Sequence, residues 1–240
     1  MQTMRIMKGR RVFRWLRYAL HALALLLVID AGYILGLLPD WEHYQNGPIQ
    51  KSNFIKTYEF RHASDAGLPS LQWRPVPLSR ISRHLTRAII VAEDARFYEH
   101  EGIDAEALKQ AMEYNIANLK WAYGGSTISQ QMIKNMLLSP SRNPLRKWHE
   151  LWLTIDLERH VSKRRILEIY MNVAEFGRGI YGAEAGARHY WGKSAASLNP
   201  AEAIALAASL SNPVHDNPIT RTDYFQRQVR KIRRNLRWSK

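Results

Sequence analysis

The sequence predicts a mostly α-helical domain behind a single membrane-spanning helix. Two observations carry this prediction: residues 18–38 form one long apolar segment, and apolar side chains recur at helical spacing through most of residues 80–220. The 240-residue chain has room for that segment plus one domain with a substantial core. It contains no cysteine, which excludes disulfides and thiolate metal sites and is compatible with a reducing or an oxidising compartment.

The positive charge of the chain is concentrated at its two ends. The net charge is +14, yet residues 1–17 hold six basic and no acidic side chains, and residues 221–240 hold eight basic side chains and one acidic one. The 203 residues between them therefore have a net charge of only +1. A nucleic-acid-binding domain would need this charge on its own surface, so the distribution argues against a nucleic-acid partner.

Residues 18–38 read as a transmembrane helix, preceded by a cytoplasmic basic segment at residues 1–17. At ~1.5 Å per residue the apolar segment is about long enough to cross a hydrocarbon layer of ~30 Å. The positive charges before it predict a cytoplasmic N-terminus and an exported domain. Asp30 opposes insertion by roughly 2.5–3.5 kcal/mol, which the leucine-rich flanks can offset. A cleaved signal peptide is the alternative, but the segment has no convincing small-residue cleavage site.

Residues 39–79 read as a juxtamembrane connector, because proline and glycine recur there and leave room for only one or two short strands. The helical domain at residues 80–220 follows, and its first helix has apolar residues at helical spacing from Ile81 to Ala92. Residues 221–240 form a basic C-terminal segment. We expect it to lie against anionic lipid headgroups or to be a solvated basic helix.

Four further helices are predicted from N-terminal capping residues and from the glycines and prolines that follow them. They begin after Asp104, Asn143, Ser162 and Asn199. The first, third and fourth of them end at Gly124-Gly125, at the loop Gly177-Arg178-Gly179 and at Asn212-Pro213.

The first candidate for chemistry is Glu93, at the end of the apolar helix. Apolar neighbours and the negative end of the helix dipole both oppose ionisation, so we expect the pKa of Glu93 to be raised toward neutrality. A carboxyl group in that range can exchange protons at working pH. The alternative is that Glu93 and Asp94 form a solvated C-terminal turn.

Two more groups of polar residues follow between the helices. Gly124 and Gly125 precede a helix start rich in hydroxyls and amides, which offers hydrogen bonds to a polar ligand, with Lys134 near enough for an anionic group. Farther on, Arg146 and Lys147 share a helical face with Glu150, and Arg142 precedes them. The alternatives are a polar helix start and an ordinary surface ion-pair ladder.

Taken together, these groups resemble the five motifs of the peptidoglycan glycosyltransferases of glycosyltransferase family 51. The resemblance runs from about Trp73 to Pro213, in the family's order. The matching stretches are Glu93-Asp94-x-x-Phe97-x-x-His100-x-Gly102, Gly124 to Asn135, Arg142 to Glu150, Lys163-x-x-Ile166-Leu167-Glu168-x-Tyr170-Met171-Asn172 and Arg178-Gly179-x-x-Gly182-Ala183. The resemblance implies a lysozyme-like helical fold, anchored in the bacterial cytoplasmic membrane and working on its outer face.

The resemblance also implies roles for individual residues. Glu93 becomes the general base that deprotonates the acceptor sugar hydroxyl, and Glu150 assists the leaving diphosphate, directly or through a divalent ion such as Mg²⁺. No cofactor is required and no metal ligand is assigned. The cations that fall where the family binds lipid-linked diphosphates are Lys134, Arg142, Arg146 and Lys147.

Other motif residues receive weaker assignments. Arg96, Ser126 and Gln131 are candidates for substrate contacts, while Glu168 and Asn172 are expected to support the site. His100 matches a motif position as either a structural or a catalytic histidine.

The function implied is that of a monofunctional polymerase of glycan strands, since no Ser-x-x-Lys motif of a transpeptidase domain is present. It would transfer the lipid-diphosphate-linked growing chain onto lipid II, form a β-1,4 bond and release undecaprenyl diphosphate. Expected partners are lipid II, the nascent strand, membrane lipids and, as candidates, cell-division or elongation proteins. The alternatives are a membrane-anchored peptidoglycan hydrolase, which needs no cations for a diphosphate, and an inactive glycan-binding scaffold.

Overall fold

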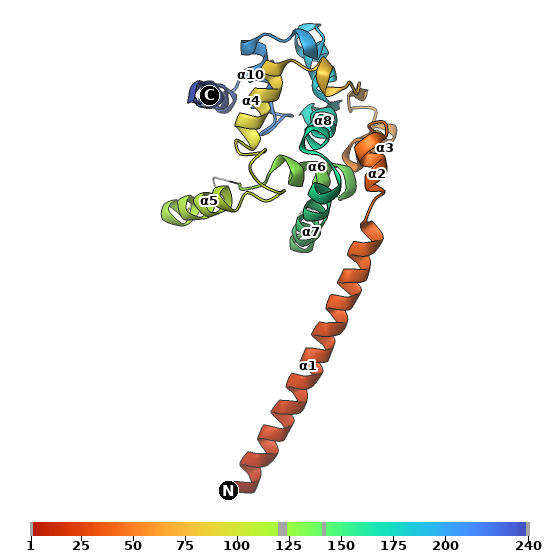
Figure 1. Ribbon diagram of the computed structural model, residues 1–240, viewed down its shortest axis with the longest axis vertical. Helices are drawn as coiled ribbons and strands as arrows, with labels where there is room; N and C mark the ends of the chain where they lie inside the picture. The colour runs from red at the N-terminus through yellow and green to blue at the C-terminus, as the bar shows by residue number, and fades with distance from the viewer. Residues whose placement is uncertain (1, 120–123, 141–142, 239–240) are drawn as a thin grey trace. The chain divides into compact units, whose positions relative to one another are not determined.

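The computed structural model describes residues 2–119, 124–140 and 143–238, and the chain forms two compact units (Figure 1). The first ends at Pro39 and the second begins at Asp40. Arg142, one of the expected substrate-binding residues, lies outside the described residues.

The first unit contains one helix, α1 (Gln2–Leu37), which is long and apolar enough to cross a membrane. Its 36 residues span about 54 Å. Leucine and valine side chains along it are exposed, with Leu26 at 63% and Val28 at 69%. The helix begins well before residue 18, so the basic segment continues the same helix as the apolar one.

The second unit begins with the stretch expected as a connector. It contains α2 (Trp41–Asn46), α3 (Asn53–Ser64), β1 (Gln72–Trp73) and the short 3-10 helix η1 (Leu78–Arg80). The side chains of Asp40 and Ser52 cap α2 and α3, respectively. The stretch packs onto the helical body, because Asn53 Nδ2 donates to the Leu137 carbonyl at 2.9 Å.

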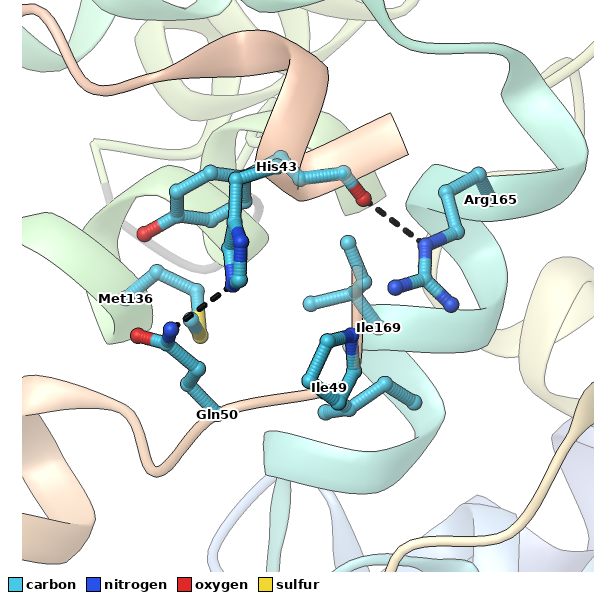
Figure 2. A pocket seen from close by; sticks show the side chains of 8 residues that line it. His43, Ile49, Gln50, Met136, Arg165 and Ile169 are labelled. Carbon is cyan, nitrogen blue, oxygen red and sulfur yellow. Dashed lines mark hydrogen bonds between the residues drawn. The ribbon is translucent and has the colours of Figure 1, made fainter. Parts of the chain in front are cut away.

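Figure 2 shows part of this packing, where a small pocket separates the α2–α3 stretch from the helices behind it. Arg165 Nε donates to the backbone carbonyl of Tyr44 at 2.8 Å, and Gln50 Nε2 lies 2.7 Å from His43 Nε2. Residues 40–79 are therefore part of the same compact unit as the helical domain.

The body consists of α4 (Arg83–Glu93), α5 (Ala105–Asn118), α6 (Ile128–Leu137), α7 (Pro144–His160), α8 (Lys163–Val173), α9 (Ala183–Trp191), α10 (Pro200–Ser209) and α11 (Asp223–Trp238). Helix α6 packs against α7 and α8, α10 packs against α4, and α11 covers both α10 and α4. The predicted helix starts are found, and the mostly α-helical fold class is confirmed.

A small sheet interrupts the helices in the order β1–β3–β2. β2 (Glu175–Gly177) and β3 (Ile180–Tyr181) form an antiparallel hairpin, and β1 pairs with β3 in parallel, with Trp73 opposite Tyr181. The sequence predicted only a loop between Gly177 and Gly179, because strands of two or three residues leave no readable alternation.

Two helices expose their apolar faces. No residue of α5 is buried, and Ile116 is 70% exposed. On α7, Leu145, Trp148 and Trp152 are exposed by 51%, 43% and 46%. Both helices lie at the same edge of the second unit (Figure 1). The exposed apolar side chains of α5 and α7 therefore do not pack into the core of this unit.

Candidate active site

Glu93 is the last residue of α4, and the helix places it directly beyond the core. Leu85, Ala88 and Ile89 on the same helix are fully buried. Gln131 Nε2 donates to Glu93 Oε2 at 2.8 Å. Burial raises the pKa of Glu93, although the Gln131 bond and the charges of nearby lysines oppose the rise. The predicted direction of the pKa shift is confirmed.

Gln131 is held from both sides. It lies on the first turn of α6, whose start is fixed by a capping box between Thr127 and Gln130. The Tyr170 hydroxyl donates to Gln131 Oε1 at 3.0 Å, which directs the amide nitrogen toward Glu93. Gln131 therefore stabilises the ionised form of the candidate base.

Lys134 lies one turn farther along α6 and is partly buried. Burial lowers its pKa, while the charges of Glu150 and Glu93 raise it, so the ammonium group lies within electrostatic reach of both glutamates. It forms no hydrogen bond or ion pair with any residue that the structure describes. A partly buried ammonium group that pairs with none of the described residues is suited to bind an anionic ligand.

Glu150 is 2% exposed on α7 and holds two cations. Arg146 Nη1 donates to Glu150 Oε2 at 2.9 Å, and Lys147 Nζ donates to Glu150 Oε1. Lys147 Nζ also lies 3.1 Å from Ser126 Oγ, which ties the loop before α6 to this helix. Four of the expected site residues therefore form one hydrogen-bonded group: Ser126, Arg146, Lys147 and Glu150.

Arg96 is turned away from this group. Its Nε donates to Glu99 Oε2 at 3.1 Å, and its Nη1 lies 3.6 Å from Asp104 Oδ1. Arg96 therefore binds its own loop, and within the described residues its side chain pairs with Glu99 and Asp104 and not with the other expected site residues.

Two residues expected to support the site hold the stretch before α4 onto α8. Asn172 Oδ1 accepts from the Val76 amide at 2.8 Å, and Glu168 Oε1 accepts from the Leu78 amide at 2.7 Å.

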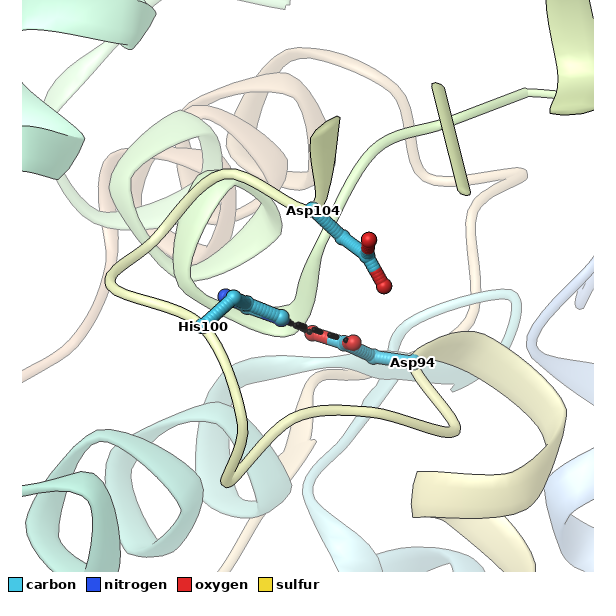
Figure 3. Close-up of side chains that lie close together, drawn as sticks. All are labelled: Asp94, His100 and Asp104. Carbon is cyan, nitrogen blue, oxygen red and sulfur yellow. Dashed lines mark hydrogen bonds and ion pairs between the residues drawn. The ribbon is translucent and has the colours of Figure 1, made fainter. Parts of the chain in front are cut away.

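Asp94 and His100 form a clamp between two motifs, with Asp104 beside them (Figure 3). The Gly102 amide donates to His100 Nδ1 at 3.1 Å, so the ring proton is on Nε2, which donates to Asp94 Oδ1 at 2.9 Å. Asp94 Oδ2 accepts from the amide of Ile128, the first residue of α6, at 3.0 Å. The clamp fixes the loop after Glu93 to the helix that carries Gln131.

The three clamp residues are close enough together to be considered as a metal site. However, both ring nitrogens of His100 are already used, one by a backbone donor and one by Asp94. No lone pair of the histidine is left for a metal ion, and the donor set fits a structural role.

One charged residue of the site was not expected there. Helix α11 packs against α4, with Phe225 and Ile232 each only 3% exposed. This packing brings Lys231 within electrostatic reach of Glu93, and its charge lowers the pKa of that carboxyl. The sequence showed Lys231 only as one of many C-terminal cations. Its contribution depends on a contact between distant parts of the chain.

A family model described as transglycosylase matches residues 66–237. The chain belongs to the transglycosylase family. Among its curated relatives, a biosynthetic peptidoglycan transglycosylase of Dechloromonas aromatica is 44% identical over 200 residues, covering 83% of this chain and 85% of the relative. Proteins of the same description from Methylobacillus flagellatus and Caulobacter vibrioides are 49% and 43% identical, covering 70% and 93% of this chain and 72% and 92% of theirs. The transglycosylase match includes both candidate catalytic glutamates.

Proposed function

We propose that this transglycosylase polymerises peptidoglycan glycan strands from lipid II and releases undecaprenyl diphosphate. The observation that carries the proposal is Lys134, a partly buried ammonium group with no partner among the described residues and within electrostatic reach of both Glu93 and Glu150. Transfer from a diphosphate donor to a sugar hydroxyl requires a base for the hydroxyl and a cationic group for the diphosphate.

Glu93 acts as the general base. Its carboxylate takes the proton of the acceptor hydroxyl of lipid II while that oxygen bonds to the anomeric carbon of the growing chain. The bond from this carbon to the diphosphate oxygen breaks, and the electron pair leaves with undecaprenyl diphosphate. The raised pKa of Glu93 makes it a stronger proton acceptor than an exposed glutamate.

Lys134, Arg146 and Lys147 stabilise the negative charge that develops on the leaving diphosphate. Glu150 orients the last two through its direct bonds to them. A hydrolase that cleaves an unphosphorylated glycan has no leaving group for these cations. The cluster therefore favours a polymerase over the hydrolase alternative.

No resident cofactor is part of the proposal. Each Glu150 carboxylate oxygen already accepts from a cation, so a metal ion at Glu150 would have to share these oxygens with Arg146 and Lys147. A divalent ion such as Mg²⁺ would bind with the diphosphate of the substrate and add to the same charge stabilisation. Polymerisation assayed with EDTA, and again after Mg²⁺ is restored, tests this: a loss that Mg²⁺ reverses would make the ion a requirement.

We place the enzyme in the bacterial cytoplasmic membrane, with the N-terminus inside and the domain outside. Support comes from α1, from the basic residues before its apolar part, and from the exposed apolar faces of α5 and α7. Candidate partners are membrane lipids and proteins of cell division or elongation. A reporter fused after Pro39 should be active only outside the cytoplasm, and cytoplasmic activity would contradict the topology.

The decisive test is polymerisation of purified lipid II by the full chain. Glu93→Gln should lower the rate by about 10²–10⁴, the usual contribution of a general base. Glu99→Gln is the matched control, because Glu99 is exposed and pairs only with Arg96 among the described residues. A Glu93→Gln enzyme with the wild-type rate would remove Glu93 as the base. Cleavage of preformed glycan without polymerisation would favour the hydrolase.

Lys134→Ala tests the leaving-group site separately. We expect weaker lipid II binding or a lower rate constant, because the ammonium group meets the diphosphate in both the bound and the reacting state. Steady-state kinetics over a range of lipid II concentrations distinguishes the two effects. If neither kcat nor KM changes, Lys134 has no part in the site.

A further inference from the structure

A second cavity lies between α3 and the small sheet, and none of the catalytic residues lines it. Its volume is about 580 Å³, within the usual range of ligand sites. Its lining includes Tyr58, Arg61, Asp65, Glu175, Arg178 and Tyr181. Helix α3 and helix α4, which carries Glu93, stand on opposite sides of α8 (Figure 1). The cavity is therefore separate from the candidate active site.

Glu175, the first residue of β2, lines this cavity. Its side chain is partly buried and hydrogen-bonded to the backbone of Gly179, and it makes no ion pair with a described residue. Burial raises its pKa to about 7. Its charge also raises the pKa of the hydroxyls of Tyr58, Tyr181 and Tyr190, so the carboxyl lies within electrostatic reach of all three, and Tyr58 and Tyr181 line the cavity with it.

The hydroxyl of Tyr181 is a second unused group. The residue is 4% exposed, and its ring meets that of Tyr58 edge to face with centroids 5.9 Å apart. Its hydroxyl forms no hydrogen bond with a described residue, whereas every fully buried side-chain nitrogen or oxygen in the described ranges has a partner. The Tyr181 hydroxyl is therefore accessible, and the accessible space beside it is this cavity.

The charges around the cavity nearly balance. Arg61 and Arg178 are exposed at its rim and form no hydrogen bond or ion pair through their side chains within the described parts of the chain. Asp65 and the ionised form of Glu175 oppose these two cations, and because the pKa of Glu175 is about 7 the net charge of the lining lies between 0 and +1 near neutral pH. A site with so little net charge selects neither a polyanion, such as a nucleotide, nor a strongly basic peptide. Its unused donors and acceptors fit a neutral ligand that carries many hydroxyl or amide groups.

We propose that this cavity binds a neutral N-acetylated sugar segment of a glycan strand, outside the catalytic site. The aromatic rings supply a flat apolar wall for a sugar ring, while Glu175 accepts hydrogen bonds from hydroxyls. Arg178 and the Tyr181 hydroxyl donate to hydroxyl or acetamido oxygens. The choice of a glycan strand rests on the proposed function, because a strand polymerase produces that ligand.

The test uses the neutral β-1,4-linked tetrasaccharide of N-acetylglucosamine and the full chain in detergent micelles, with affinity measured by calorimetry. Tyr181→Phe and Arg178→Ala should each weaken binding about three- to tenfold, the value of one lost hydrogen bond. Tyr181→Phe keeps the ring and its packing, so folding is preserved. Arg80→Ala is the control, since Arg80 is exposed and does not line the cavity, and it should leave the affinity unchanged.

Unchanged affinity in both variants, or no binding by the wild type at millimolar sugar, would overturn the inference. Preferential binding of an acidic peptide at the same residues would overturn it too. Lipid II polymerisation by the wild type is measured in parallel. Polymerisation without sugar binding would refute the second site and leave the proposed function intact. Sugar binding that the variants weaken, without polymerisation, would refute the function and leave a glycan-binding site.

Discussion

Replacing Glu175 by glutamine should stabilise the protein at alkaline pH and not at acid pH. Burial raises the pKa of Glu175 from its ordinary 4.5 to about 7. A carboxyl with a raised pKa destabilises the folded state when it ionises. Below pH 4.5 it is protonated in both folded and unfolded chains and has no effect. Between 4.5 and 7 the stability of the wild type falls, and above 7 the full loss is present.

The size of this effect follows from the shift. A change of about 2.5 pKa units at ~1.36 kcal/mol per unit gives about 3 kcal/mol, an upper value because the side chain is partly exposed. For a chain of this size 1 kcal/mol moves Tm by roughly 2–4 °C, so the glutamine variant should melt about 6–12 °C above the wild type at pH 8. At pH 4.5 the two should melt together apart from any effect of the amide itself.

Thermal unfolding followed by circular dichroism in detergent, from pH 4.5 to 8, measures this difference. Glu101→Gln is a suitable control, because Glu101 is exposed. A difference in Tm between Glu175→Gln and wild type that stays constant over this range would refute the reasoning. So would a difference that grows as the pH falls, because it would mean that ionised Glu175 stabilises the fold.

The remaining predictions concern the active site and its loop. Lys231→Met should raise the pKa of Glu93 and move the acid limb of the pH profile of kcat/KM to higher pH. Arg227→Met, on the same helix, should leave this profile unchanged. If the Lys231→Met and wild-type profiles superimpose, the charge of Lys231 does not act on Glu93. Gly102→Ala should destabilise the fold by about 1–3 kcal/mol, because Gly102 has φ +87° and a Cβ there would lie 2.8 Å from Thr154 Cγ2. An unaltered Tm would rule out this strain.

The sequence was sufficient for features that depend on local chemistry. Asp104 caps α5, Asn143 caps α7, and the apolar spacing before Glu93 ends at a carboxyl with a raised pKa, as predicted. The two caps depend on residues within the first turn of their own helices, and the raised pKa of Glu93 follows from burial, which the apolar spacing of its helix predicts. The grouping of Lys134 with Glu150 needed the resemblance to a family, because no local pattern brings α6 and α7 together.

Features that depend on contacts between distant segments were not predicted. Arg96 pairs with Glu99 and Asp104, two carboxylates of the loop that follows it. Lys231 reaches Glu93 only because α11 folds back onto α4. The second cavity needs α3 and β2, which are too short or too weakly patterned to be placed from sequence.

The apolar faces of α5 and α7 affect how this protein behaves in water. A single exposed apolar side chain is ordinary, but Ile116, Leu145 and Trp152 belong to two helices at the same edge of the second unit. Deleting α1 would leave this surface intact. A fragment beginning at Asp40 should therefore still self-associate at high concentration and still require a mild detergent for purification, despite lacking the only helix described here that is long enough to span a bilayer.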